Sequence, residues 1–168
     1  MSIAQSAGQQ GAEIAGMLDG GMLFTAAAEV WSGEQVHTEI IHRTGRDALR
    51  PEEHHLLQTW RDDTAACCRR EGVIRTASGL KVAEVSALYL PGRIADRGVI
   101  EQLQCTDTPL GRALQVLDVR RETLGTRMLE RGPFAVIASG LLLLPESLGG
   151  LPVALAREQV YREFTLPC

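Results

Sequence analysis

The sequence predicts an α+β domain with antiparallel strands. Strand-like runs follow one another in the chain, and helical patterns are interspersed between groups of them. Strict alternation of strands and helices would instead indicate a parallel sheet. The length of 168 residues fits one domain with its own hydrophobic core. We expect a flexible lead over residues 1–12 and a single domain over residues 13–168.

Several segments have helical patterns. Residues 13–31 carry apolar side chains at helical spacing, but Gly20 and Gly21 interrupt them, which favours two short helices joined by a turn. Residues 51–66 open with Pro51 and two acidic residues, as is typical of a helix start. Two further helices are expected, over residues 93–103 and from Pro109 onward.

Strands are predicted where β-branched and aliphatic residues gather between turn residues. Gly33 precedes the first such run, and Pro91 ends the third. The longest apolar run, residues 134–144, is too short to span a membrane and is interrupted by Ser139 and Gly140. The predicted strands are residues 35–42, 70–76, 80–90, 116–124, 134–144 and 151–164.

The charge balance limits the classes of partner. The formal net charge is −4 and the isoelectric point is near 5.6. Proteins that bind nucleic acid broadly, or an anionic membrane surface, carry the opposite balance, so we expect neither partner. The basic residues are sixteen arginines and one lysine, Lys81. Because arginine makes planar, two-pronged contacts with carboxylates, a few well-placed arginines could hold a small anion.

Targeting and cofactor signals are weak. The N-terminus lacks the basic start and apolar stretch of a signal peptide, which predicts a cytoplasmic protein. The four histidines lack the spacing of metal ligands, and no nucleotide-binding motif occurs, so we expect no metal and no organic cofactor. Reduced thiols are expected for the four cysteines, Cys67, Cys68, Cys105 and Cys168, which fit no zinc-binding or Cys-x-x-Cys spacing.

One tetrapeptide, TPLG at residues 108–111, indicates a helix start with Pro109 in its first turn. Together with its surroundings it resembles the chorismate pyruvate-lyases. In that family an arginine opens a strand, a second strand ends near a proline, and a helix leads to a PLG turn. The resemblance covers about residues 18–165, including DGGMLFTAAAEVWSGEQVHTEII near the start and GLPVALAREQVYREF near the end.

The resemblance implies a set of site residues. The substrate arginine of the family falls on Arg70, with the adjacent Arg69 as the alternative. The catalytic glutamate, expected to act as acid or base, falls on Glu158. The remaining implied binding residues are Leu110 and Gly111 through their backbone, Phe24 and Thr25 in the pocket lining, and Arg75 as a second basic residue.

The resemblance also implies a fold and an activity. We expect an antiparallel sheet with helices on one face, and a lyase that eliminates pyruvate from chorismate to give 4-hydroxybenzoate without a cofactor. The apolar run at residues 134–144 keeps open a cyclase or dehydratase that acts on a less charged intermediate. A third alternative is a non-catalytic module that binds a small acid, as in some bacterial transcription regulators. That alternative is the least favoured here, because the lead is too short for a DNA-binding helix-turn-helix. The oligomeric state is left open.

Overall fold

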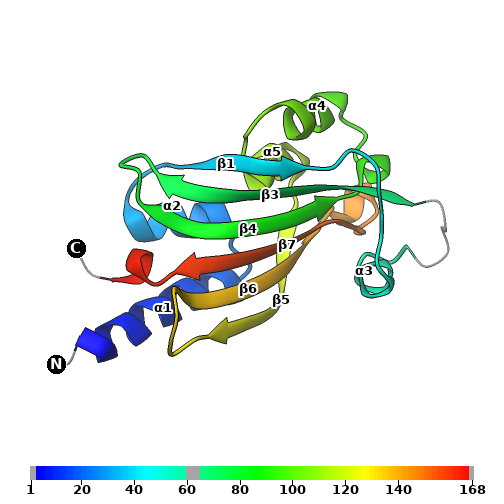
Figure 1. Ribbon diagram of the computed structural model, residues 1–168. Coiled ribbons are helices and arrows are strands. Elements are labelled where there is room, and N and C mark those ends of the chain that lie inside the picture. Colours follow the sequence, from blue (N-terminus) through cyan, green and yellow to red (C-terminus); the bar gives the residue numbers. More distant parts are fainter. Residues whose placement is uncertain (1–2, 60–64, 167–168) are drawn as a thin grey trace.

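The computed structural model describes residues 3–59 and 65–166 and has at its centre a seven-stranded sheet (Figure 1). The strand order is β1-β3-β4-β7-β6-β5, with β2 paired to β3, and all pairings are antiparallel. The α+β class with an antiparallel sheet is thereby confirmed. The strands are β1 (Val36–Arg43), β2 (Asp47–Ala48), β3 (Ala66–Thr76), β4 (Lys81–Tyr89), β5 (Arg120–Met128), β6 (Phe134–Leu143) and β7 (Pro152–Tyr161).

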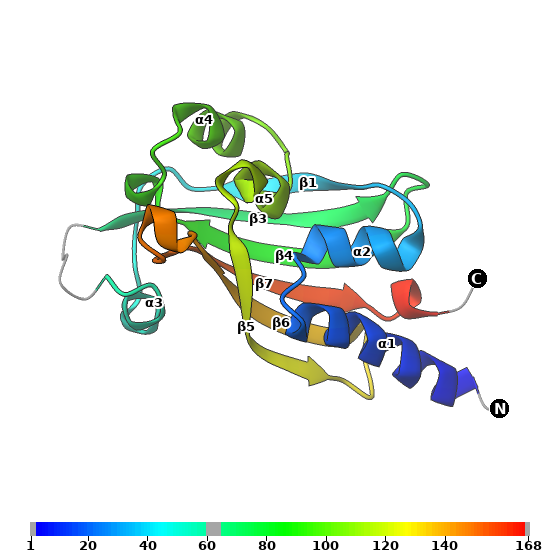
Figure 2. The same cartoon turned by 180° about the vertical axis from the view of Figure 1, so that it is seen from behind.

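Four of the described helices, α1, α2, α4 and α5, gather on one face of the sheet (Figure 2). Side chains of α1 and α2 form one core cluster with β3, β6 and β7, while α4 and α5 form a second cluster nearer the other end of the same sheet. The short helix α3 packs on the opposite face, in a third cluster that includes Leu88 and Leu141. These two side chains alternate along their strands with Ala87 and Gly140, which project toward the other helices. The helices are α1 (Ile3–Asp19), α2 (Phe24–Ser32), α3 (Pro51–Leu56), α4 (Arg97–Cys105) and α5 (Leu110–Leu114).

The glycine pair separates α1 from α2, as predicted. Gly21 has a backbone φ of +90°, which residues other than glycine rarely adopt, and the chain reverses there. The first helix begins at Ile3, ten residues before the helical segment expected from residue 13. The middle of this helix lies against the sheet, since a Cβ on Gly11 would lie 2.8 Å from the Met128 methyl carbon of β5.

Several predicted elements are wrong in extent. The strand expected over residues 70–76 is β3, which begins four residues earlier, at Ala66. The helix expected over residues 51–66 ends at Leu56, because Gln58 has a φ of +55° and β3 already begins at Ala66. The strand expected over residues 116–124 lies at Arg120–Met128 instead. A 3-10 turn ending at Asp118, whose φ is +53°, occupies the preceding residues.

Candidate ligand-binding site

The site begins with a row of small side chains across the sheet. Arg70 of β3 pairs with Ala87 of β4, Ala87 pairs with Ala156 of β7, and Ala156 pairs with Gly140 of β6. Residues directly opposite one another in a sheet project from the same face, here the face that the helices cover. Because three neighbouring strands contribute nothing larger than a methyl group, space is left between the sheet and the helices at this row.

A cavity lies over this row. Its volume open to the centres of water-sized spheres is about 60 Å³. The first turn of α2 lines it with Phe24 and Thr25, and the start of α5 lines it with Leu110 and Gly111. The remaining lining residues are Leu23, Thr38, Ile40, Arg70, Ile74, Val85, Ala87, Pro109, Arg121, Leu142, Ala156 and Glu158.

Arg70 is buried in this cavity without a counter-ion. It is 4% exposed, and its Nη2 donates to the carbonyl oxygens of Thr106 (3.1 Å) and Thr108 (2.8 Å). Its Nε has no hydrogen-bond partner, and among the described residues no carboxylate lies within ion-pair distance of it. Burial, and then the nearby charge of Arg43, lower the pKa of the Arg70 guanidinium. A buried cation in this state favours the arrival of an anion.

A second arginine in the cavity, unlike Arg70, has a carboxylate partner among the described residues. Arg121 of β5 donates from Nη1 and Nη2 to the two oxygens of Glu158 at 2.7 and 3.0 Å, and from Nε to the Thr123 hydroxyl at 3.0 Å. The side chains of Arg121 and Glu158 are 1% and 4% exposed. Such a bidentate ion pair is rigid as well as strong, so it forms a fixed, neutral part of the wall.

Thr38 supplies another unused polar atom. This residue of β1 is buried, and its Oγ1 has no hydrogen-bond partner in the part of the chain that the structure describes. Buried polar atoms in folded proteins are almost always paired. Two unpaired polar atoms, Arg70 Nε and Thr38 Oγ1, therefore line one cavity that is otherwise mostly apolar.

The structure brings together most of the residues singled out in the sequence. Arg75 is the exception: it lies near the surface, with its Nε 3.3 Å from Glu39 of the edge strand β1. Its expected place in the binding pocket is not found, because it alternates with Ile74, which faces the cavity. The predicted residues that line the cavity are Phe24, Thr25, Arg70, Leu110, Gly111 and Glu158.

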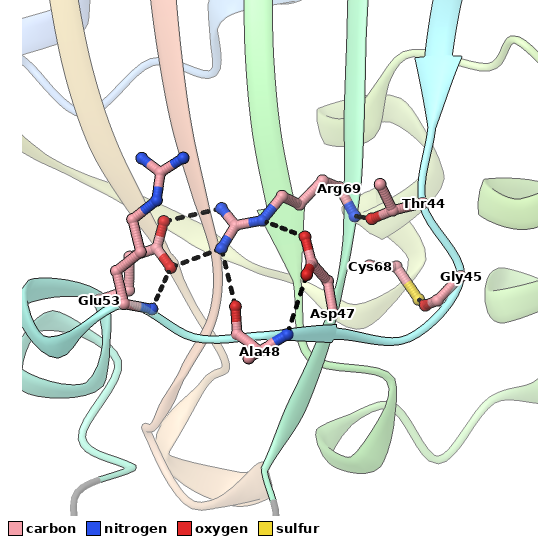
Figure 3. A network of polar contacts seen from close by, with 8 residues as sticks. Thr44, Gly45, Asp47, Ala48, Glu53, Cys68 and Arg69 are labelled. Atoms are coloured by element: carbon pink, nitrogen blue, oxygen red, sulfur yellow. Dashed lines mark hydrogen bonds and ion pairs between the residues drawn. The ribbon is translucent and has the colours of Figure 1, made fainter.

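The alternation of side chains along β3 places Arg70 in the cavity and Arg69 on the other face. Arg69 points away from the cavity and holds a polar network on the opposite face (Figure 3). Its guanidinium bonds both oxygens of Glu53 at 2.7 Å and Asp47 Oδ2 at 2.8 Å. Arg69 thus fastens β2 and α3 to the sheet, and Arg70 is the one of the two that lines the cavity.

Two residues of the site were missed in the sequence, Arg121 and Thr38. A signal for each was present. Arg120 and Arg121 are adjacent in a strand, so one of them must point inward. Thr38 lies between Val36 and Ile40 at period two, which places its hydroxyl on the buried face of β1.

Comparison with known proteins adds information on the fold. No protein-family model and no curated protein matches the chain. Among solved structures, the effector domain of PhnF from Mycobacterium smegmatis superposes with a TM-score of 0.61 and 14% identity, covering 84% of this chain and 88% of that domain. The ligand-binding domain of a putative GntR-family transcriptional regulator from Bordetella bronchiseptica gives a TM-score of 0.55 and 12% identity, covering 75% and 84%.

The chain has the fold of these regulator domains. A structure of PhnF from the same mycobacterium matches with a TM-score of 0.60 and 13% identity over 83% of this chain and 64% of that one, so the chain spans about two thirds of PhnF. A GntR-family regulator from Enterococcus faecalis V583 gives a TM-score of 0.54 and 14% identity, covering 78% and 96%.

The expected chorismate pyruvate-lyase activity is wrong by this comparison, because the matching structures are effector and ligand-binding domains of regulators. In the site, both oxygens of Glu158, the expected acid or base, accept hydrogen bonds from Arg121.

Other features bear on partners. No described helix is long and apolar enough to cross a membrane. Within residues 3–59 and 65–166, no three His, Cys, Asp or Glu side chains are grouped as metal ligands would be. Of the cysteines, Cys67, Cys68 and Cys105 are free thiols, and Cys168 lies outside the described residues.

Proposed function

We propose that this domain is a non-catalytic ligand-binding module that senses a small organic acid. The observation that carries the proposal is Arg70, a buried arginine with an unpaired Nε and no carboxylate partner among the described residues, in a mostly apolar cavity. The fold shared with effector domains of transcription regulators supports a sensing role. The small-acid-binding alternative thus replaces the lyase as the preferred function.

The cavity indicates the shape of the ligand. A carboxylate accepts hydrogen bonds from Arg70, and an apolar body lies over Ala87 and Ala156. Thr38 offers its hydroxyl to a further polar group. Thr38 pairs with Ile74, four residues along β3 from Arg70. At a rise of about 3.3 Å per residue, that separation spans about 13 Å, so Thr38 and Arg70 bind different ends of the ligand.

The acidic domain itself does not supply a broad basic surface for DNA. In a regulator built on this module, DNA contacts are made by a separate domain, and the ligand acts by shifting the population of the regulator between two states. A cytoplasmic location, predicted from the sequence, is consistent with that role.

The proposal is tested by calorimetric titration of small aliphatic and aromatic monocarboxylic acids against their uncharged amides. We expect at least one acid to bind, its amide to bind at least about tenfold more weakly, and Arg70→Gln to lose at least about tenfold in affinity for that acid. Arg75→Gln, five residues along the same strand and near the surface, is the matched control and keeps wild-type affinity. Absence of binding by every acid, or full affinity in folded Arg70→Gln, would overturn the proposal.

A further inference from the structure

The structure points to Glu158 as the residue that sets the charge of the ligand. We propose that the Arg121–Glu158 ion pair makes the cavity selective for monoanions over dianions, and that Glu158 is a specificity-determining residue. This inference rests on the proposed function, because it takes for granted that an anion binds at Arg70.

The argument starts from the formal charges that line the cavity. Among its described lining residues, the charged side chains are Arg70, Arg121 and Glu158, which give a net charge of +1. A monoanion brings the occupied site to neutrality. A dianion leaves one negative charge in a buried, mostly apolar space, where an unpaired charge is costly.

Charges outside the lining do not alter this balance. Arg43, Tyr89 and Asp107 are the nearby groups whose charges act on Arg70: Arg43 lowers its pKa, and Tyr89 and Asp107 raise it. Burial raises the pKa of the Tyr89 phenol, so Tyr89 is uncharged near neutral pH. Arg43 and Asp107 form an ion pair with each other, 2.9 Å between Arg43 Nη2 and Asp107 Oδ1, and both side chains are about a third or more exposed. A solvated neutral pair contributes little field inside the cavity.

The ion pair cannot easily rearrange to admit a second carboxylate. Arg121 lies flat against β6, where a Cβ on Gly140 would come within 2.7–2.9 Å of three guanidinium atoms. The Thr123 hydroxyl accepts a hydrogen bond from Arg121 Nε, and Glu158 accepts one from each terminal nitrogen of Arg121. A guanidinium has five N–H donors, so two remain. Because Glu158 already neutralises the charge, those two donors suit a neutral acceptor such as a hydroxyl or carbonyl oxygen of the ligand.

The charge account makes a different prediction for each variant of the pair. Glu158→Gln raises the net charge of the lining to +2 and favours a dianion. Arg121→Gln lowers it to zero and favours a neutral ligand. The double variant Arg121→Gln/Glu158→Gln returns it to +1 and restores the preference for a monoanion. If the ion pair had only a structural role, each variant would lose affinity for the dianion, the monoanion and the neutral ligand to the same extent.

Three ligands of one carbon skeleton test this series. Near neutral pH, succinate carries two negative charges, monomethyl succinate one and dimethyl succinate none. We expect wild type and the double variant to bind monomethyl succinate at least about tenfold more tightly than succinate. In Glu158→Gln, we expect the preference for monomethyl succinate over succinate to fall at least about tenfold. In Arg121→Gln, we expect the preference for monomethyl succinate over dimethyl succinate to fall at least about tenfold. Binding is measured by calorimetry, and folding by circular dichroism and thermal melting.

The outcomes separate this inference from the proposed function. Arg70-dependent binding of monomethyl succinate, with ratios that stay unchanged in folded Glu158→Gln and folded Arg121→Gln, would overturn charge selection and leave acid sensing in place. If Glu158→Gln does not fold, the unchanged ratio in Arg121→Gln is decisive by itself. If wild type binds some acid but no four-carbon acid, the succinate series is replaced. The replacement is a dianion, a monoanion and a neutral ester that share the carbon skeleton of the acid that binds. If no acid binds at all, both proposals fail.

Discussion

Gly140 makes room for the guanidinium of Arg121 over strand β6. At this position any Cβ would overlap the guanidinium group, which is itself held by Glu158 and Thr123. The atoms in conflict belong to the far end of a long side chain, so the backbone can stay in place while Arg121 moves. The glycine is thus required by a close approach and not by its backbone conformation.

We therefore predict that Gly140→Ala distorts the buried ion pair and lowers the free energy of unfolding by about 1–3 kcal/mol. Denaturant unfolding measures the change. Gly125→Ala is the matched control, because Gly125 lies in the adjacent strand β5 and a Cβ there would meet nothing within 4 Å. Equal stability of the two alanine variants would show that Arg121 is not held as tightly as its hydrogen bonds indicate.

The single residues also show what a sequence can and cannot specify. The resemblance singled out Arg70, which opens the predicted strand, yet Arg69 remained an alternative. Neighbouring residues on a strand face opposite ways, and the sequence does not say which face is covered. Arg121 was missed for a related reason. The partner that makes it functional, Glu158, is 37 residues away and meets it only after β5, β6 and β7 align in one sheet.

At the scale of elements, the network around Arg69 connects β3 to the segment that contains β2 and α3 (Figure 3). Burial raises the pKa of the Glu53 carboxyl. The hydrogen bonds from the Arg69 guanidinium and the Arg50 backbone N–H, with the charges of both arginines, outweigh burial and hold the pKa below its ordinary value of 4.5. A carboxyl with a lowered pKa stabilises the fold above its unfolded-state pKa, and that contribution is lost as the pH falls through the folded-state pKa.

We expect Glu53→Gln to lower the free energy of unfolding near neutral pH by about 1.5–3 kcal/mol, because it removes charged hydrogen bonds to Arg69. The difference from wild type should shrink as the pH drops below 4.5, where the wild-type carboxyl also loses its charge. Denaturant unfolding at a series of pH values measures both effects. Glu52→Gln, an exposed change in the same helical turn, is the control. A difference that stays constant with pH would contradict the assigned role of the Glu53 charge.

The same segment shows the limit of local patterns. Pro51 and the acidic residues correctly predict where α3 starts. They do not predict where it ends, because residues after Leu56 have helix-compatible side chains while the positive φ of Gln58 turns the chain. The start of β3 at Ala66 is likewise imposed by pairing, since Ala66 and Cys67 bond to β2. Tertiary pairing overrides helix propensity here.

At the scale of the whole molecule, the cavity is a product of register. The residues of its floor, Arg70, Ala87 and Ala156, are spread over 87 positions of the chain. They meet in one row with Gly140, which Arg121 covers, only because four strands align. The class of fold was predictable from consecutive strand-like runs, and several lining residues were predictable from a resemblance. The empty space itself was not, because alanine and glycine in a strand carry no signal until their neighbours are known.

This origin of the cavity leads to a prediction on Ala156. Ala156→Leu places a larger apolar side chain over the floor, into space that the wild-type fold leaves open. We expect affinity for the small-acid ligand to fall at least about tenfold. We expect the free energy of unfolding to change by less than about 1.5 kcal/mol, because the added methyl groups fill a void.

The contrast with Ala154 makes the prediction specific. Ala154 lies two residues earlier on the same face of β7 but is 0% exposed and packs in the core with Leu142 and Val153. Ala154→Leu overpacks that core, so we expect it to lower the free energy of unfolding by about 1–3 kcal/mol. Calorimetric titration and denaturant unfolding of both variants test the pair of expectations. Loss of stability without loss of binding in Ala156→Leu would mean that the ligand site lies elsewhere and that the row of small residues serves packing alone.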